Sequence, residues 1–234
     1  MAGAYARLRP GYPDEVVGFL LGAGQRRVLD LGAGTGKLSE ALLKAGHEVV
    51  AVDPDVEMLA ELGARHPDAQ TLVGTAEAIP LPDDAVDAVV VGQAAHWFDV
   101  PLAATEIGRV RRPAGVVGLV WNLRDERVPW VAALSELLDD TQVVTDVDEP
   151  AAGLAEVLGA KLERAEFGHV HSLPLEQVVD GIATRSRVVL LEPAERGRLL
   201  QAARDLFATH PDTTGRQVLE HPYRTFAYKL TDSD

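Results

Sequence analysis

The chain has 234 residues, of which 47% are hydrophobic and 25% charged, which is typical of a soluble globular protein of one domain or one domain with an elaboration. Its formal net charge of −14 argues against tight binding to nucleic acid or anionic lipid, because both need a basic surface. The chain has no cysteine, which excludes disulfides, thiolate nucleophiles and cysteine-ligated metals.

Short apolar runs alternate with amphipathic stretches over the first half of the chain. The apolar runs predict strands at 26–32, 48–53, 69–74, 85–92 and 115–122. The amphipathic stretches predict helices at 35–46, 56–66 and 101–112. Thr35 is the expected N-cap of the first helix and Gly46 its expected end. This alternation indicates an α/β fold, with a mostly parallel sheet that is covered by helices on both faces.

The pattern changes after Asn122. A helix is predicted near 128–139 and an acidic loop at 143–153, and the segments 165–173 and 222–230 alternate like antiparallel strands. The residues between those two strands are mostly helical in pattern. We therefore divide the chain into an N-terminal lid segment 1–25, a core 26–172, a helical insertion 173–219 that caps the carboxyl edge of the sheet, and a last strand 220–234.

A glycine loop lies between the first strand and the first helix. Gly32, Gly34 and Gly36 allow a sharp turn and a close approach of a ligand to the backbone, and the helix start supplies free N–H groups. A dinucleotide fingerprint would carry a glycine where this chain has Lys37. Asp30 would repel a pyrophosphate but attract an ammonium group. The loop therefore favours a nucleoside that bears an amino acid over a nicotinamide cofactor.

Asp53 ends the second strand, where an acid can accept hydrogen bonds from both ribose hydroxyls. Because Pro54 follows, Asp53 also fits the N-cap of the next helix. Asp53 can play both roles only if one carboxylate oxygen caps the helix and the other binds the ribose. Together with the glycine loop, the position favours ribose.

These motifs resemble those of the class I S-adenosylmethionine-dependent methyltransferases. The segment VLDLGAGTG is similar to the first motif of that family, VVAVDPDVEML to the second, and GTAEAIPLPDDAVDAVVVGQAAHWF to the adenine-binding segment with the fourth strand. EIGRVRRPAGVVGLVWN is similar to the helix and fifth strand that follow. YARLRPGYP and QAAHWF most resemble the small-molecule branch that includes trans-aconitate methyltransferase-like proteins. The resemblance implies a doubly wound, Rossmann-like sheet of seven strands with a reversed last strand.

The resemblance also implies roles for single residues, with S-adenosylmethionine as the cofactor and S-adenosylhomocysteine as the product. The methionine part would be held by Asp30, Gly32, Gly34 and Gly36, and the sulfonium end would lie above Gln93, Ala94 and Ala95. Asp53 would bind the ribose, and the adenine would contact Met58, Ala76 and Glu77. Thr75 stands where many members carry an aspartate that accepts from the adenine amino group, so its hydroxyl or a backbone carbonyl would have to replace that acceptor.

The loop after the fourth strand carries an imidazole and two aromatic rings. His96 lies beyond the carboxyl end of that strand, where ligands bind in such sheets, and neutral imidazole is suited to act as a base near neutral pH. Three roles remain open for His96: catalytic base, contact with substrate or cofactor, or support of the loop. Trp97 and Phe98 would form a wall of the pocket or pack in the core.

Further residues are candidates on the substrate side and in the lid. Tyr5 and Arg9 are expected at the methionine end of the cofactor, and Arg9 also suits a substrate carboxylate; a surface arm is the alternative for this segment. The expected substrate-side residues are Tyr12, Trp97, Trp121, Asn122 and Arg185. Core packing is the alternative for Trp121, and plain surface exposure is the alternative for Arg185 and Arg187.

We expect an enzyme that transfers a methyl group to oxygen, nitrogen or carbon of a small molecule by in-line displacement. The alternatives are an NAD(P)-dependent oxidoreductase and a member of the fold that binds the cofactor without methylating. His169 and His171 share a strand face, but we expect no metal site because no third ligand is apparent. Because the sequence shows no signal peptide and no membrane-spanning segment, we expect a cytoplasmic protein with no nucleic-acid or membrane partner. The sequence leaves both a monomer and a homodimer as alternatives.

Overall fold

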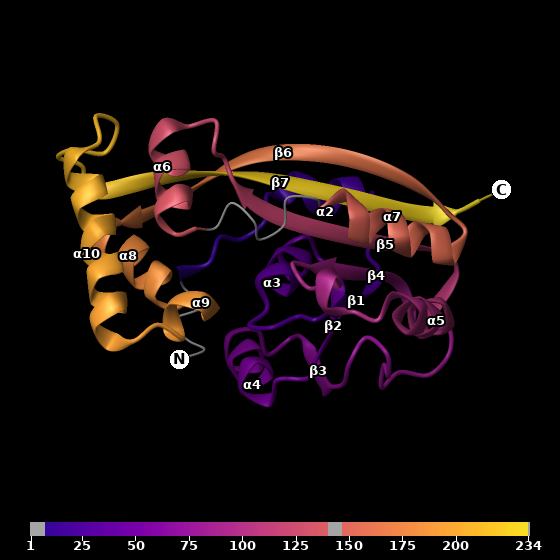
Figure 1. Ribbon diagram of the computed structural model, residues 1–234. Coiled ribbons are helices and arrows are strands. Elements are labelled where there is room, and N and C mark those ends of the chain that lie inside the picture. Colours follow the sequence, from indigo (N-terminus) through magenta and orange to yellow (C-terminus); the bar gives the residue numbers. More distant parts are fainter. Residues whose placement is uncertain (1–7, 140–146, 234) are drawn as a thin grey trace.

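The computed structural model describes residues 8–139 and 147–233. One seven-stranded sheet runs through it in the order β3-β2-β1-β4-β5-β7-β6 (Figure 1). The strands are β1 (Arg27–Leu31), β2 (Glu48–Asp53), β3 (Gln70–Val73), β4 (Val86–Gly92), β5 (Arg111–Arg124), β6 (Ala160–Pro174) and β7 (Val218–Asp232). β1 to β5 pair in parallel, whereas β7 runs antiparallel to both β5 and β6. The predicted α/β fold with a reversed last strand is confirmed.

One face of the sheet is covered by α2 (Asp14–Leu21) and α3 (Lys37–Lys44). Val16, Val17 and Leu20 of α2 are at most 2% exposed and pack with strand residues such as Val28 and Val90. α2 lies within the range 1–25 that the sequence assigned to a lid. Residues 14–21 are therefore a core helix, and residues 8–13 are the described part of that range that precedes it.

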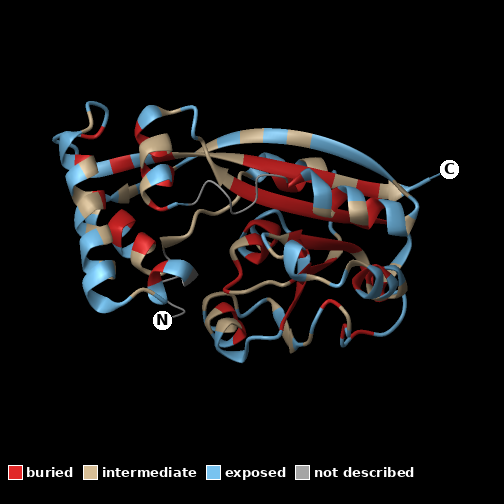
Figure 2. Cartoon of the chain, in the orientation of Figure 1, coloured by how far each residue is buried: buried red, intermediate tan, exposed pale blue. Residues whose placement is uncertain are grey.

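The other face is covered by α5 (Val100–Val110) and α7 (Asp148–Leu158), while α4 (Val56–Arg65) connects β2 to β3. Buried residues of both faces form the red interior of the sheet in Figure 2. α7 corrects the predicted acidic loop over residues 148–153. Its acidic residues Asp148 and Glu149 occupy the first turn, where they complement the helix dipole, and Ala151 and Leu154 pack inward. Residues 143–146 of that prediction lie outside the described residues.

A second group of helices forms a cap at one end of the sheet (Figure 1). The cap consists of α6 (Pro129–Leu137), α8 (Leu175–Ala183), α9 (Ser186–Val189) and α10 (Pro193–Thr209). Their apolar residues form a separate cluster that includes Trp130, Val179 and Phe207. α8, α9 and α10 lie between β6 and β7 in the chain. α6, within the range 26–172 assigned to the core, packs with them.

The two longest strands carry the cap. β5 ends where Arg124 pairs with Tyr223, but β6 and β7 continue their pairing up to Pro174 and Val218. Residues 165–173 of β6 alternate between half-buried and exposed, which confirms the predicted period of two. The ribbon of β6 and β7 therefore extends past the carboxyl end of β5 and places the cap over that edge of the sheet.

Candidate functional site

The glycine loop joins β1 to α3 at the carboxyl edge of the sheet. Gly32 has φ +72° and Gly34 φ +54°, conformations that L side chains rarely adopt. The amide of Gly32 donates to the carbonyl of Val52 at 2.8 Å, which ties the loop to the end of β2. α3 begins after Gly36, which is its N-cap in the left-handed region; the predicted cap, Thr35, is buried and makes no capping bond.

Asp53 holds this loop in place. Its Oδ2 accepts from the amide of Gly34 at 2.8 Å, and its Oδ1 accepts from the amide of Asp55 at 2.8 Å. The N-cap of α4 is Asp55, whose side chain accepts from the amides of Glu57 and Met58. The capping alternative for Asp53 is therefore wrong. A carboxylate oxygen has two lone pairs, so each oxygen of Asp53 can accept a further donor.

Asp30 is a buried carboxyl group with an unpaired oxygen. Its side chain lies at the end of β1 and the residue is 1% exposed. Ser39 Oγ donates to Oδ2 at 2.6 Å, whereas Oδ1 has no hydrogen-bond partner among the described residues. Burial raises the pKa of Asp30 to about 7, against the lowering effect of the Ser39 hydrogen bonds. A cation at Oδ1 would satisfy this oxygen and favour the carboxylate.

The loop after β4 forms the floor beneath the glycine loop. Gln93 has φ +61°, a strained conformation for a residue with a side chain, and its amide donates to the carbonyl of Val120 at 2.9 Å. A methyl group at Gly32 would lie 2.6 Å from the Cβ of Ala94, and Ala95 is buried behind it. The structure therefore brings together Gly32, Gln93, Ala94 and Ala95, which the sequence assigned to one cofactor site.

His96 and Trp97 lie on a short 3₁₀ helix, η1 (Ala95–Trp97), within the loop that joins β4 to α5. Trp97 is 80% exposed, and the centres of the two rings are 4.9 Å apart. Partial burial lowers the pKa of His96, so the imidazole is neutral at pH 7 and can accept a proton. Phe98 instead turns inward toward Gly32.

The predicted adenine segment lies beside α4. Met58 Sδ would be 3.6 Å from a methyl group at Gly34, so this thioether covers the loop. Ala76 is 4% exposed, and the Glu77 carboxylate accepts from the amide of Asp99 at 3.0 Å. The side chain of Thr75 hydrogen-bonds the side chain of Glu77. The hydroxyl that was expected to replace the family's aspartate toward the adenine is therefore already engaged.

Asn122 is a buried connector at the end of β5. Its Nδ2 donates to the carbonyl of Gly11 at 2.9 Å, and its Oδ1 accepts from Thr225 Oγ1 at 2.6 Å. Because that bond uses the only hydroxyl proton of Thr225, the Nδ1 of His169, at 3.1 Å, must be the donor to Thr225 Oγ1. The carbonyl of Asn122 also accepts from Gln93 Nε2 at 2.9 Å. Asn122 thus links the N-terminal segment, β4, β5 and β7.

Two aromatic candidates have different positions. Tyr12 is half-buried, and its hydroxyl would be 2.7 Å from a methyl group at Gly92, so it lies against the end of β4. Trp121 is 1% exposed and meets the Tyr228 ring edge-on at 5.5 Å. Trp121 is therefore a core residue, which corrects the expectation that it lines the acceptor site. Successive side chains of a strand point to opposite faces, so Trp121 and Asn122 cannot share one pocket.

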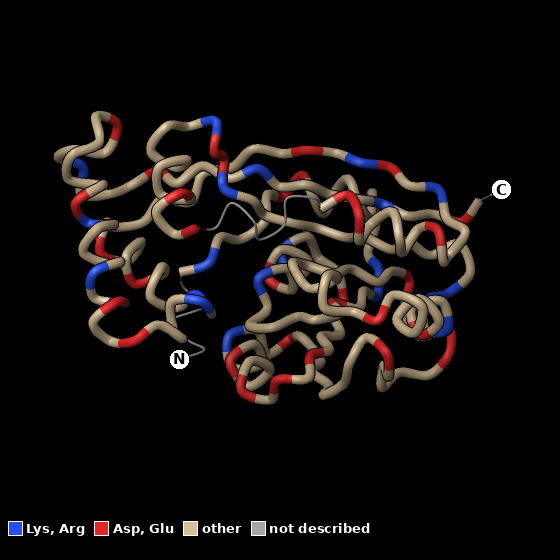
Figure 3. Tube along the Cα trace, in the orientation of Figure 1, with Lys and Arg blue, Asp and Glu red and all other residues tan. Residues whose placement is uncertain are grey.

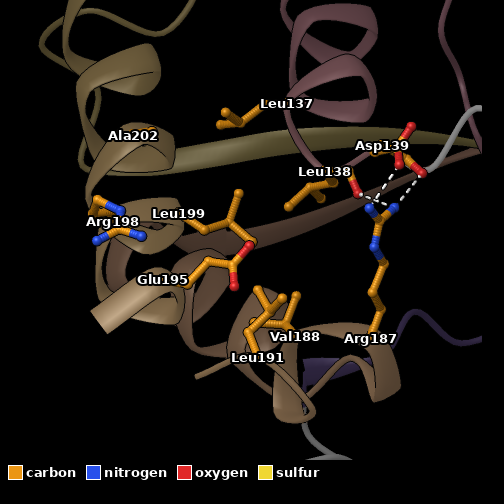
Figure 4. Close-up of a pocket in the computed structure, with 10 residues that line it drawn as sticks. All are labelled: Leu137, Leu138, Asp139, Arg187, Val188, Leu191, Glu195, Arg198, Leu199 and Ala202. Atoms are coloured by element: carbon orange, nitrogen blue, oxygen red, sulfur yellow. Dashed lines mark hydrogen bonds and ion pairs between the residues drawn. The ribbon is translucent and has the colours of Figure 1, made fainter. Parts of the chain in front are cut away.

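A cavity between the core and the cap gathers arginines. Arg9 of the N-terminal segment, Arg124 of β5 and Arg185 after α8 line it together with His221 and Tyr223 of β7. Arg187 belongs to a different cavity, where it pairs with Asp139 at 2.6 Å and donates to the Leu138 carbonyl (Figure 4). Tyr5 lies outside the described residues.

Sequence reasoning missed Arg124, His221, Tyr223 and Ser39. Arg124 is two residues past Asn122, and extending the predicted fifth strand would have included it. His221 and Tyr223 lie in the first half of the last strand, almost a hundred residues later in the chain, and no local pattern links them to Arg124. Ser39 lies on the first turns of a predicted helix, and only its contact with Asp30 reveals its role.

Comparison with known proteins agrees with this geometry. Residues 29–119 match the model of a methyltransferase domain family. The chain is 44% identical over 233 residues to an uncharacterized methyltransferase of Mycobacterium tuberculosis, covering 98% of this chain and 93% of that one. It is 32% identical over 231 residues to an uncharacterized methyltransferase of Schizosaccharomyces pombe, covering 96% and 92%.

Solved structures share the fold. A methyltransferase from Anabaena variabilis, proposed to act in antibiotic biosynthesis, superposes with a TM-score of 0.69 at 24% identity, over 92% of this chain and 95% of that one. Geranyl diphosphate C-methyltransferase of Streptomyces coelicolor, solved with S-adenosylhomocysteine, gives a TM-score of 0.51 at 14% identity, over 94% and 78%. The chain therefore belongs to the methyltransferase family, and its fold is that of the class I S-adenosylmethionine-dependent methyltransferases.

Proposed function

We propose that the protein transfers a methyl group from S-adenosylmethionine to a small-molecule acceptor by in-line displacement. The observation that carries this proposal is the site at the end of β1. There the glycine loop in its left-handed conformation, its tie to Asp53 and the oxygen of buried Asp30 that has no partner among the described residues meet in one place. When bound, the cofactor would supply a methyl group activated by a sulfonium, because the neutral thioether S-adenosylhomocysteine is a good leaving group.

The residues present fit this cofactor. Asp30 Oδ1 would accept from the methionine ammonium, and the remaining lone pairs of Asp53 would accept from the ribose hydroxyls. Met58, Ala76 and Glu77 would edge the adenine. The same Asp30 argues against a nicotinamide dinucleotide, because it would face the pyrophosphate with a second negative group.

On the acceptor side, the chain has to position the nucleophile and exclude water. Holding two reactants in alignment can contribute roughly 7–11 kcal/mol in favourable intramolecular models. Gln93, Ala94 and Ala95 would form the floor below the methyl group. His96, neutral and at the mouth of the site, would contact the acceptor and take its proton where the acceptor has one to lose. The cap lies over the carboxyl edge of the sheet, next to these residues in the fold, which suits a small molecule rather than a polymer.

Titration of the protein with S-adenosylhomocysteine in a calorimeter tests the proposal. We expect binding in the wild type and at least roughly tenfold weaker binding in Asp53→Ala, because that variant loses the ribose acceptor and the tie to Gly34. Asp68→Ala, an exposed acid on the loop before β3, is the matched control. If the titration with S-adenosylhomocysteine gives no binding signal, the proposal is wrong. Binding of NADH instead would favour an oxidoreductase.

Turnover with labelled S-adenosylmethionine separates an enzyme from a protein that only binds the cofactor. With an accepted substrate, His96→Ala should lower turnover more than it lowers the affinity for S-adenosylhomocysteine. Equal turnover in wild type and variant would leave His96 as a support of the loop. Cofactor binding without turnover on acids, phenols and amines would favour a non-methylating member of the fold.

A further inference from the structure

The cavity between the core and the cap concentrates positive charge in an acidic protein. The whole chain has a formal net charge of −14, yet three arginines line this one cavity, Arg9, Arg124 and Arg185. Among the described residues that line it, none is aspartate or glutamate. Arginine is the side chain best suited to bind carboxylate or phosphate, because its planar fork donates two parallel hydrogen bonds.

The three arginines converge from separate parts of the chain. Arg124 is the last residue of β5, Arg185 follows α8 in the cap, and Arg9 precedes α2 in the core. Arg124 and Tyr223 are register partners across β5 and β7. The three arginines come together only when the insertion folds back over the sheet, so the cavity exists only in the fully folded chain.

One buried nitrogen in the wall of the cavity has no hydrogen-bond partner among the described residues. His221 is 5% exposed, and its Nε2 has no hydrogen-bond partner among the described residues. The ring of Tyr223 lies 4.7 Å from that of His221 and 5.5 Å from that of His169, which forms an aromatic wall. Burial, with Arg124 and Arg185 nearby, lowers the pKa of His221 to about 3, so this imidazole stays neutral and adds no charge. Buried polar atoms are normally hydrogen-bonded, so this nitrogen is open to a ligand in the cavity.

The cavity lies next to the proposed methyl-transfer site. Arg124 is two residues beyond Asn122 on the same strand, a separation of roughly 7 Å. The carbonyl of Asn122 accepts from Gln93, a floor residue of the proposed cofactor site, and its side chain donates to Gly11, two residues from Arg9. An acceptor held by the arginines would therefore extend toward the floor residues.

We propose that Arg124 and Arg185, with Arg9, His221 and Tyr223, bind the anionic group of the methyl acceptor, so that the substrate is a small molecule with a carboxylate or a phosphate. The arginines would donate to the anion and the wall of Tyr223 and His221 would flank it. This inference rests on the proposed function, because it assigns the acceptor of that same reaction.

The test uses the full-length protein saturated with S-adenosylhomocysteine. Succinate, phenylacetate and phenyl phosphate are titrated in a calorimeter, each beside an uncharged counterpart: succinamide, phenylacetamide and phenol. We expect at least one acid to bind and its counterpart to bind at least about tenfold more weakly. The acids separate carboxylate from phosphate recognition. Acids that bind no better than their counterparts overturn the inference.

Variants assign the binding to this cavity. Arg185→Gln and Arg124→Gln should each weaken binding of the acid by about tenfold or more, since each removes a charge-assisted contact. Arg185→Lys, which keeps the charge but loses the fork, should fall between wild type and Arg185→Gln. Arg187→Gln is the matched control, because its guanidinium pairs with Asp139 in the other cavity, and it should change the affinity by less than about twofold.

The titration with S-adenosylhomocysteine distinguishes the two proposals. If the protein does not bind S-adenosylhomocysteine, the proposed function fails, whatever the acids do. If Arg185→Gln and Arg124→Gln bind S-adenosylhomocysteine more weakly but keep their affinity for the acid, the arginines hold the cofactor, which overturns this inference alone. Equal affinity of Arg185→Gln and Arg187→Gln for the acid also overturns it. Melting temperatures within a few degrees of the wild type confirm that the variants are folded.

Discussion

At the scale of single residues, the buried carboxyl group of Asp30 lowers the stability of the folded protein near neutral pH. It lies at the end of β1, almost without exposure, and one of its oxygens has no partner among the described residues. Its pKa is about 7 in the folded protein and near 3.8 in an unfolded chain. Between these values the folded protein holds a proton that the unfolded chain has released. The free energy of unfolding therefore falls as the pH rises through this window.

Asp30→Asn should remove this penalty while keeping the shape and the contact with Ser39. We expect the variant without cofactor to melt above the wild type at pH 8 and close to it near pH 4. The gain at pH 8 should be of the order of 1–4 kcal/mol, since one pKa unit corresponds to about 1.36 kcal/mol. S-adenosylhomocysteine should bind more weakly, because the acceptor for its ammonium is lost. Calorimetric melting at both pH values measures the effect, and a lower melting point at pH 8 would contradict it.

Gly32 belongs to the same scale. Gly32→Ala would place a methyl group 2.6 Å from the Cβ of Ala94, in a backbone conformation that disfavours any side chain. We expect a loss of about 1–3 kcal/mol in urea unfolding. Adding Ala94→Gly should recover part of this loss, because it removes the clash but leaves the backbone strain. Gly197→Ala in α10, where no atom lies within 4 Å, is the control and should not destabilise.

At the scale of elements, Thr225 links β5, β6 and β7 and, through Asn122, the N-terminal residues 8–13. It is fully buried on β7, donates to Asn122 and accepts from His169. Thr225→Val keeps the volume but leaves both partners unpaired, so we expect a loss of about 1–3 kcal/mol. Hydrogen exchange should also quicken at residues 8–13, because Asn122 holds the carbonyl of Gly11.

Thr209→Val is the control for this experiment. Thr209 is exposed on α10, and its hydroxyl donates only to the carbonyl of Asp205, so the loss should stay below about 0.5 kcal/mol. If Thr225→Val leaves exchange at residues 8–13 unchanged, Asn122 holds that segment without help from Thr225.

The elements differ in how far the sequence predicts them. β2, an unbroken apolar run that ends at Asp53, has the predicted bounds. α7 was mistaken for a loop because its first turn is acidic and contains Pro150, a composition that suits both a loop and a helix start. The apolar residues of α2 were overlooked because the helix has only eight residues and its burial depends on β5 and β7.

At the scale of the whole molecule, the apolar interior is divided. The sheet carries one cluster on each face, and the cap has its own cluster around Trp130 and Phe207. Lysines, arginines and acidic residues are spread over both parts in Figure 3, so overall charge does not distinguish them. No helix of the described chain is long and apolar enough to cross a membrane.

Phe207→Ala tests whether the cap can loosen without disturbing the cofactor site. The ring is fully buried and meets Trp130 edge-on at 6.0 Å. We expect a loss of about 3–5 kcal/mol within the cap and faster hydrogen exchange in α8 and α10. Exchange in β1 and β4 and the affinity for S-adenosylhomocysteine should stay within about twofold of the wild type, since neither strand contributes to the cap cluster.

Leu20→Ala provides the opposite case. Leu20 is 1% exposed in the cluster of α2 and the sheet, so this change should quicken exchange in the core before the cap. Equal loss of protection in both parts for both variants would mean that core and cap unfold as one unit.

The sequence by itself determined the order of β1 to β5 with α3, α4 and α5 between them, the glycine loop and most of the proposed cofactor residues. These features are local: periodicity, turn residues and spacing within residues 26–122 carry them, and the connections of a parallel sheet bring strand ends to one edge. The tertiary structure decided the rest. It placed Trp121 in the core, made Asp55 rather than Asp53 the helix cap, and brought Arg124, Arg185 and Tyr223 into one cavity. The cap of α4 depends on which side chain reaches the first helical amides, and the burial of Trp121 on its packing against Tyr228 of β7. The cavity joins residues far apart in the chain, so it forms only when the insertion packs over the sheet.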